Sequence, residues 1–318
     1  MFRNILMTTV AATAMVGSAY AADLPSRKAP PPAYIPPPLM TWTGFYVGVN
    51  GGGIWSNSSV VTTGTNLGVP ALIAPGFSAA AAQAANNTIN PSRIGGLGGA
   101  QWGYNWQFGS FVLGTESDFQ GVFTGNNNCG NNGGGFGGFG GNSNCTAVTL
   151  APLGGGFAIQ NIQTIDRRMD YFGTSRVRAG FLVTPTFLVY ATGGVAYGHV
   201  RLNSTTLSTI TPAVPPAIFG PGISTVNYSQ IKAGFTAGGG FEWMFLPNWS
   251  VKAEALYYDL GRSTFNQNFS QTLLPAVFAI PISRTATQTT WRNNGVIARA
   301  GINYHFNWGA PAAVVARY

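Results

Sequence analysis

The residues of this sequence that could do acid–base chemistry are few, and most lie where polar and apolar residues alternate. The 318 residues include eight acidic ones, and five of these occupy the polar face of an alternating segment: Glu116, Asp118, Asp170, Glu242 and Glu254. Seven basic residues share these faces: Arg93, Arg168, Arg176, Arg178, Lys232, Lys252 and Arg299. Structural ion pairs are a commoner cause of such clusters than catalysis. We therefore predict a charge network, not a catalytic centre.

Two histidines and two cysteines complete the reactive side chains. His199 has Ser and Thr residues nearby, but no carboxylate is evidently placed to orient it for a serine hydrolase. His199 and His305 are the candidate axial ligands of a haem, yet they occur at opposite strand ends. Cys129 and Cys145 share one Gly/Asn-rich segment, which favours a disulfide over an incomplete zinc site. The sequence therefore predicts no enzyme, no cofactor and no metal.

Eight segments show the period-two alternation of strands with one apolar face. They span residues 43–55, 93–107, 110–123, 165–183, 186–201, 230–245, 249–260 and 292–308. Three connections are tight turns, and the other four are long: 56–92, 124–164, 202–229 and 263–291. Short turns at one end and long loops at the other predict an all-β fold, an eight-stranded antiparallel up-and-down transmembrane β-barrel.

Composition agrees with a membrane protein built of strands. Charged residues make up 8% of the chain, against about 25% in a typical soluble domain. No run of 18 apolar residues follows the N-terminal segment, so no transmembrane helix is expected. Aromatic residues concentrate at strand ends, as two interfacial belts require. An eight-stranded lumen is only wide enough for side chains to fill it, so the inward charges predict a plugged barrel with a small positive excess.

The two ends of the chain have their own signatures. Residues 1–21 read as a secretory signal, with Arg3 before an apolar stretch and a small-residue cleavage site. Seven prolines make residues 22–41 an extended periplasmic linker. The barrel then covers residues 42–308, and residues 309–318 form a C-terminal extension.

Four stretches together carry a family resemblance. The mature start ADLP, the Pro-rich leader, the segment WTGFYVGVNGGG at 42–53 and the segment RAGINYHF at 299–306 resemble the RopB-type outer-membrane proteins. These are small OmpA-like barrels of alphaproteobacteria, a group that includes haemin-binding surface proteins. The resemblance implies an eight-stranded barrel in the bacterial outer membrane. The final strand also resembles the recognition signal of the barrel-insertion machinery, carried by Arg299, Gly301, Tyr304 and Phe306.

The predicted function is structural: a surface-exposed outer-membrane protein that supports the envelope and displays its loops. The alternatives are a narrow porin for small solutes and a surface protein that binds haemin or another ligand. Expected partners are the lipid bilayer, lipopolysaccharide and the barrel-insertion machinery, with peptidoglycan and phage or host ligands as candidates for the loops. The basic residues are scattered singly, which excludes the clustered footprint of a nucleic-acid binder.

Overall fold

The computed structural model describes residues 41–68, 76–128, 144–154, 157–211, 219–273 and 280–306. All of them belong to one compact unit. The signal segment, nearly all of the Pro-rich linker and the C-terminal extension lie outside these residues, so their boundaries stay predictions. Within the described residues, no helix is long and apolar enough to cross a membrane.

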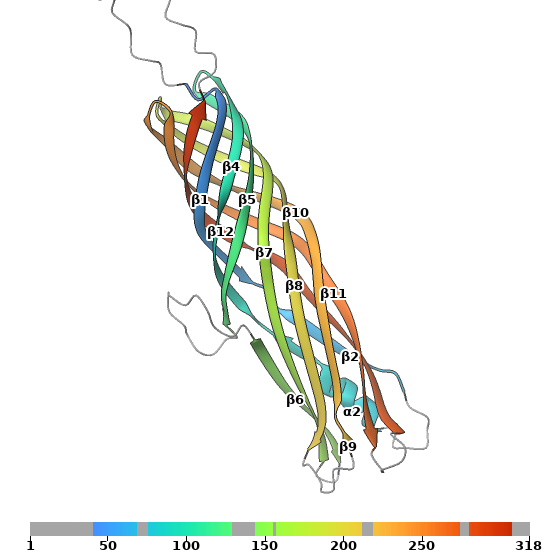
Figure 1. Ribbon diagram of the computed structural model, residues 1–318. Helices are drawn as coiled ribbons and strands as arrows, with labels where there is room; N and C mark the ends of the chain where they lie inside the picture. The colour runs from blue at the N-terminus through green and yellow to red at the C-terminus, as the bar shows by residue number, and fades with distance from the viewer. Residues whose placement is uncertain are drawn as a thin grey trace, which may run out of the picture. The chain divides into compact units, whose positions relative to one another are not determined.

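Eight antiparallel strands close into a barrel (Figure 1). They are β1 (Gly44–Asn57), β4 (Ser92–Phe108), β5 (Phe111–Asn128), β7 (Phe157–Thr184), β8 (Phe187–Thr211), β10 (Gly222–Leu246), β11 (Trp249–Leu273) and β12 (Ile280–Phe306). Each pairs with the next along the chain, and β12 returns to pair with β1 as well as with β11. The predicted eight-stranded barrel is confirmed, including its three tight turns, of which one uses Gly109 in the left-handed region at φ 60°.

The outward face next to the tight turns is apolar over a limited band. On β8 the outward residues run from Phe187 to Tyr197, and on β11 from Val251 to Tyr257. Large apolar side chains are exposed there, among them Val49, Phe108, Phe111, Phe123, Val177 and Ile231. Beyond the band the outward residues turn polar, as with Thr264 and Asn266 on β11. Such a band, flanked by aromatic rings, is the surface that a barrel presents to lipid.

The strands continue well past the apolar band, which corrects the prediction of four long loops. β8 reaches Thr211 and β10 begins at Gly222, so most of the predicted loop 202–229 is strand. β11 and β12 extend through much of 263–291 in the same way. The remaining long connections contain β2 (Val60–Asn66), α2 (Gly76–Ala85), β3 (Asn87–Ile89), β6 (Asn144–Gly154) and β9 (Phe219–Gly220).

Above the membrane band the ring divides into separate groups of paired strands. Pairing of β10 with β11 stops at Phe235 and Asp259, and pairing of β5 with β7 stops at Gly121 and Tyr171. Two long groups extend furthest: one is β6, β7, β8 and β10, and the other is β11, β12, β2 and β3, with β9 paired to β11. Between them, β1, β4 and β5 stay paired only a few residues further. Helix α2 contacts strands of both groups, and its buried alanines pack against Ile159 and Ile210.

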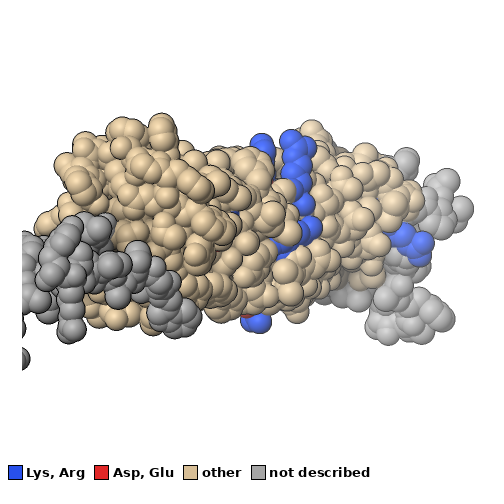
Figure 2. All heavy atoms as spheres, turned by 90° about the horizontal axis from the view of Figure 1, so that it is seen from above, with Lys and Arg blue, Asp and Glu red and all other residues tan. Residues whose placement is uncertain are grey.

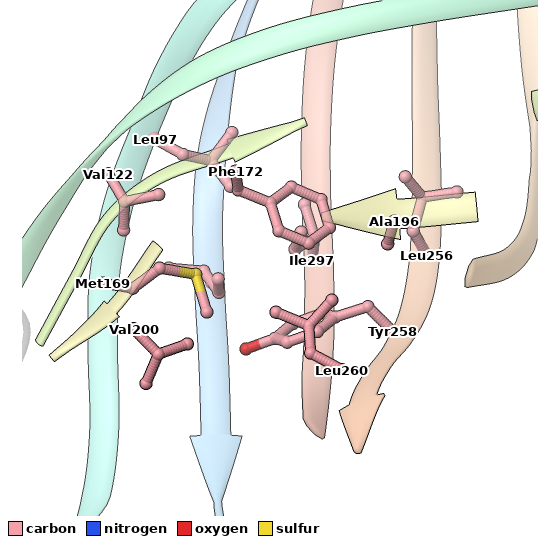
Figure 3. Close-up of a cluster of buried hydrophobic side chains, with 11 residues drawn as sticks. Leu97, Val122, Met169, Phe172, Ala196, Val200, Leu256, Tyr258, Leu260 and Ile297 are labelled. Carbon is pink, nitrogen blue, oxygen red and sulfur yellow. The ribbon is translucent and has the colours of Figure 1, made fainter. Parts of the chain in front are cut away.

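An apolar layer fills the barrel where the two regions meet. Phe172 and Met169 from β7 and Leu256, Tyr258 and Leu260 from β11 point into the lumen at this level (Figure 3). Seven of the eight barrel strands, all but β10, contribute to this layer, whose other members are Ile54, Leu97, Val122, Ala196, Val200 and Ile297. A second layer around Trp291 and Phe265 lies beyond it. The lumen is therefore packed with side chains and does not form a channel in this region.

Glycine lets β1 approach its neighbours closely where the lumen is crowded. A Cβ atom on Gly52 would lie 2.1 Å from the carbonyl oxygen of Ala298 and 2.6 Å from the Cα of Arg299. Both contacts are backbone atoms of the paired strand β12, so neither can move aside without breaking the ladder. Barrel closure at this point requires a residue without a side chain.

Candidate functional site

Among the described residues, eight charged side chains lie in contact with one another inside the part of the barrel that the apolar band surrounds. Glu116 and Asp118 come from β5, Arg176 and Arg178 from β7, Glu242 from β10, Lys252 and Glu254 from β11, and Arg299 from β12. None of these side chains is more than 2% exposed. We call this set the lumen cluster. Alternation within each strand places these residues inward, because the intervening residues face lipid.

Arg176 lies at the centre of the lumen cluster. Its Nη2 is 2.5 Å from Glu116 Oε1 and 3.1 Å from Asp118 Oδ2, and its Nη1 is 3.0 Å from Glu254 Oε2. Thr174 donates a further hydrogen bond to Asp118 at 2.6 Å. One guanidinium group therefore bridges three carboxylates on two strands, which its planar fork of donors allows.

Arg178 lies two residues after Arg176 on β7, nearer to the tight turns, and its guanidinium group contacts two tyrosine rings. Its guanidinium carbon is 5.3 Å from the ring centre of Tyr46 and 4.7 Å from that of Tyr190. Its Nη2 donates to Glu242 at 2.7 Å, while Tyr46 donates its hydroxyl proton to Glu116 at 2.7 Å. The cation is paired, stacked and withdrawn from water, a combination that stabilises a desolvated arginine.

Lys252 and Arg299 complete the charge balance. Lys252 Nζ is 2.7 Å from Glu116 Oε1, and Arg299 reaches Asp118 at 2.7 Å and Glu254 at 2.6 Å. The lumen cluster contains four carboxylates and four cations, which are three arginines and one lysine, so its net charge is zero. The positive excess predicted from the sequence is absent from it.

The end of the lumen nearest the tight turns is closed by Trp42 and His305. The Trp42 side chain is fully buried, donates its indole N–H to the Pro185 carbonyl at 3.0 Å and meets the His305 ring edge-on. His305 Nε2 lies 2.9 Å from Ser250 Oγ and 3.2 Å from Glu242 Oε1. His305 is thus part of the packed lumen, and its Nε2 is within hydrogen-bonding distance of both Ser250 and Glu242.

Two predicted members of the charge network lie outside the lumen. Arg168 and Asp170 were expected in the lumen, but they face outward, with side chains 59% and 34% exposed. The physical reason is a β-bulge in β7 between Met169 and Phe172, which reverses the inward and outward faces beyond it. Lys232 is half-buried, lies 6.0 Å from the ring centre of Tyr228 and makes no ion pair with a described residue. Nothing is described of the Arg93 side chain.

The same bulge brings one residue inward that the sequence pattern missed. Arg167 is 2% exposed and donates hydrogen bonds to the Arg292 carbonyl at 3.1 Å and to Asn293 Oδ1 at 3.0 Å. A strict period of two assigns Arg167 to the outside. The run of Arg, Arg and Met before Asp170 gives no local sign that the alternation breaks there.

The remaining predicted residues are placed as follows. On β12, Arg299 faces the lumen, while Tyr304 and Phe306 face outward beside the tight-turn end. Gly301 leaves room for the Val49 carbonyl, which a Cβ would approach to 2.8 Å. Their role as an insertion signal stays a prediction. Cys145 is buried, but Cys129 lies outside the described residues, so the disulfide also stays a prediction.

His199 has a carboxylate partner, so the prediction that no carboxylate orients this histidine is wrong. Its Nδ1 lies 2.7 Å from Asp170 Oδ2 and its Nε2 lies 2.9 Å from Ser229 Oγ. The three residues come from β7, β8 and β10 and meet on the outer face of the barrel. No sequence signal reveals the contact, because the bulge that turns Asp170 outward is invisible in the alternation.

Outside the lumen, arginines gather just beyond the apolar band. Figure 2 shows Lys and Arg side chains forming a narrow band on a largely uncharged surface. Arg168 lies opposite Arg201 in the pairing of β7 with β8, and Arg262 lies opposite Arg292 in the pairing of β11 with β12. All four are exposed, and we call them the arginine band. Asp166, Asp170 and Asp259 each pair with one member, which leaves the band with a net positive charge.

Comparison with known proteins places this geometry in context. Residues 69–278 match the model of the "Outer membrane protein beta-barrel domain" family. The chain is 28% identical over 263 residues to a 31 kDa outer-membrane immunogenic protein of Brucella melitensis, an alignment covering 82% of this chain and 88% of that one. It is 24% identical over 184 residues to a 22 kDa outer membrane protein of Rhizobium leguminosarum, covering 55% and 62% of the two chains. Among solved structures, OprG of Pseudomonas aeruginosa aligns with 84% of this chain and 97% of its own at 11% identity and a TM-score of 0.33.

Proposed function

The chain belongs to the outer membrane protein beta-barrel domain family, and we propose that it is a structural, surface-exposed component of the envelope, not a pore. The protein lies in the lipid bilayer of the bacterial outer membrane. The observation that carries the proposal is the lumen cluster, whose eight charges are fully buried and mutually neutralised. A water path for solutes would have to pass through these ion pairs.

The packing on either side of the lumen cluster supports the same role. Trp42 fills the lumen toward the tight turns, and the apolar layer around Phe172 fills it on the other side. Among the described residues, three successive layers of side chains therefore occupy the barrel. A filled interior stiffens a barrel, since close-packed side chains leave no space for the strands to move into.

The two alternatives have less support. A narrow porin would need an open lumen at the level of Arg176. A haem held by two histidines would need His199 and His305 to share a site, but His199 lies on the outer face and His305 is buried inside. A haem titration of the purified protein is expected to leave the Soret band unchanged.

We also propose that the arginine band binds the phosphates of anionic outer-leaflet lipid, of which lipopolysaccharide is the abundant example. Like charges placed directly opposite on neighbouring strands destabilise a sheet, and both arginine pairs are so placed. An anionic headgroup at this level relieves the repulsion. Each arginine near such a surface contributes about 1 kcal/mol of attraction.

Genetic complementation tests the structural role. Loss of the protein is expected to make cells sensitive to detergent and to chelators, and the wild-type protein is expected to restore resistance. The Arg262→Gln variant is expected to restore it only in part, because one phosphate contact is lost. Normal resistance in cells that lack the protein would contradict a structural role.

A further inference from the structure

We propose that Ser229, His199 and Asp170 form a hydrolytic triad on the outer face of the barrel, and that its substrate is an acyl ester of an outer-leaflet lipid. The inference rests on the proposed function in one respect, since it uses the arginine band as the site where the lipid phosphate binds. It adds an activity that the lumen does not provide.

The hydrogen bonds have the polarity that acyl transfer requires. The Asp170 carboxylate accepts from His199 Nδ1–H at 2.7 Å, which fixes the tautomer with a free lone pair on Nε2. That nitrogen lies 2.9 Å from Ser229 Oγ and can accept its proton. Carboxylate on Nδ1 and serine on Nε2 is the arrangement of the serine hydrolase triads, which is recognised by geometry and not by chain order.

The surroundings hold the imidazole in place and leave the serine accessible. The Tyr171 ring stacks on the His199 ring with 5.7 Å between centres and 17° between planes. His199 is 17% exposed, whereas Ser229 lies on the exposed face of β10. A fixed base beside an accessible nucleophile is the combination that a catalytic role needs and that a purely structural hydrogen bond does not.

The position of the three residues selects the substrate. Ile231, two residues from Ser229, is 67% exposed within the apolar band, and Val195 on the neighbouring strand is 54% exposed. Arg201, the register partner of Ser229, lies directly beside it on β8, and Arg168, the register partner of Arg201, lies one strand further on, on β7. A lipid with its chains against Ile231 and its phosphate at the arginines presents its ester carbonyl at the level of Ser229.

Arg201 also provides a donor for the developing oxyanion. Its Nε is 3.0 Å from Asp170 Oδ2, so its guanidinium group is held beside the triad. Because Arg201 and Ser229 are directly opposite on adjacent strands, their Cβ atoms are about 5 Å apart. The remaining N–H groups of Arg201 can therefore reach a carbonyl oxygen bound at Ser229.

The reaction balances without a cofactor. Ser229 Oγ attacks the ester carbonyl carbon while its proton passes to His199 Nε2. The bond from that carbon to the alcohol oxygen then breaks, and His199 returns the proton to the leaving alcohol. Water next attacks the acyl-serine ester, gives one proton to His199 and releases the fatty acid as the proton returns to Ser229.

The test uses the full-length protein folded in mixed micelles. A fluorophosphonate probe is expected to label wild-type protein at Ser229, as mapped by mass spectrometry, and the protein is expected to hydrolyse p-nitrophenyl palmitate and phosphatidylglycerol. The Ser229→Ala and His199→Gln variants are expected to lose hydrolysis by about 100-fold or more. Ser270→Ala, which changes another exposed serine, opposite Arg284 in the pairing of β11 with β12, serves as the matched control and is expected to keep full activity.

Heat-modifiable gel mobility confirms in each case that the variant is folded. Absence of labelling and of hydrolysis in folded wild-type protein would overturn the triad, as would equal hydrolysis by Ser229→Ala. Binding of fluorescent lipid A is measured on the same preparations, so that failure of the triad can be distinguished from failure of lipid binding by the arginine band. Ser229→Ala is expected to bind lipid A as the wild type does. If the wild-type protein did not bind lipid A, the proposed lipid-binding role of the arginine band would be wrong.

Discussion

Replacement of Arg176 by methionine is the perturbation that bears most directly on the lumen cluster. The side chain is fully buried and makes three ion pairs, with Glu116, Asp118 and Glu254. Without it, four carboxylates share three cations in a space closed to water. Removing one partner of a buried ion pair costs about 3–5 kcal/mol, because the other charge is left uncompensated. We expect the free energy of unfolding of Arg176→Met to fall by that amount.

The assay is urea unfolding of the protein in lipid vesicles, followed by tryptophan fluorescence. The matched control is Arg168→Met on the same strand, because the Arg168 side chain is 59% exposed and forms its ion pair with Asp166 at the surface. Exposed pairs contribute about 0–1 kcal/mol, so this variant is expected to stay close to the wild type. Combining Arg176→Met with Glu254→Gln restores neutrality, and the double variant is expected to lose about 0.5–3 kcal/mol less than the sum of the single variants. If Arg176→Met were as stable as Arg168→Met, the ion pairs of Arg176 would not stabilise the barrel.

Three further predictions concern other layers of the molecule. Burial alone would raise the pKa of Asp259, but hydrogen bonds from Arg292 and from the Gly261 N–H hold it below its ordinary value. The stabilisation is therefore present above about pH 4 and lost as the pH falls through the lowered pKa. We expect the thermal midpoints of the wild type and Asp259→Asn to differ at pH 7 and to converge in acid. A difference in midpoint that widens in acid would contradict this prediction. Gly52→Ala is expected to prevent the heat-modifiable fold because of the 2.1 Å clash with the β12 backbone, whereas Gly76→Ala, where no atom lies within 4 Å, is expected to fold normally. Trp42→Ala, which empties a fully buried site, is expected to cost about 3–5 kcal/mol in urea unfolding, and a change under about 1 kcal/mol would show that Trp42 does not close the lumen.

The barrel could be predicted from the sequence because each membrane-spanning strand has a polar and an apolar face. In β12, for example, Ile302 faces lipid while Asn303 and Arg299 face the lumen, and the printed sequence alternates accordingly. The tight turns then fix the order of pairing. Lipid imposes this alternation on every strand, which is why eight weak local patterns together identify the fold.

The extensions of the strands could not be predicted in the same way. Beyond the apolar band both faces are polar: in β8, Ser204 and Thr206 point inward and are buried, while Asn203 and Thr205 point outward. The buried side chains hydrogen-bond to one another, as Gln163 does to Ser204 at 3.1 Å. Without a hydrophobic period such segments read as loops, although threonine favours strands.

The outward site was missed because of a single inserted residue. The bulge at Asp170 moves that carboxylate from the expected lumen position to the side of His199. Bulges are set by tertiary packing and leave no period to detect. The bulge therefore explains two wrong predictions together: that Asp170 faces the lumen, and that His199 has no carboxylate beside it.

Single-channel recording in planar lipid bilayers measures whether the lumen cluster and the layers beside it close the barrel. The wild-type protein, inserted and shown to be heat-modifiable, is expected to give no current steps above the bare bilayer. Stable, reproducible steps from the folded protein would contradict a filled lumen and favour the narrow porin.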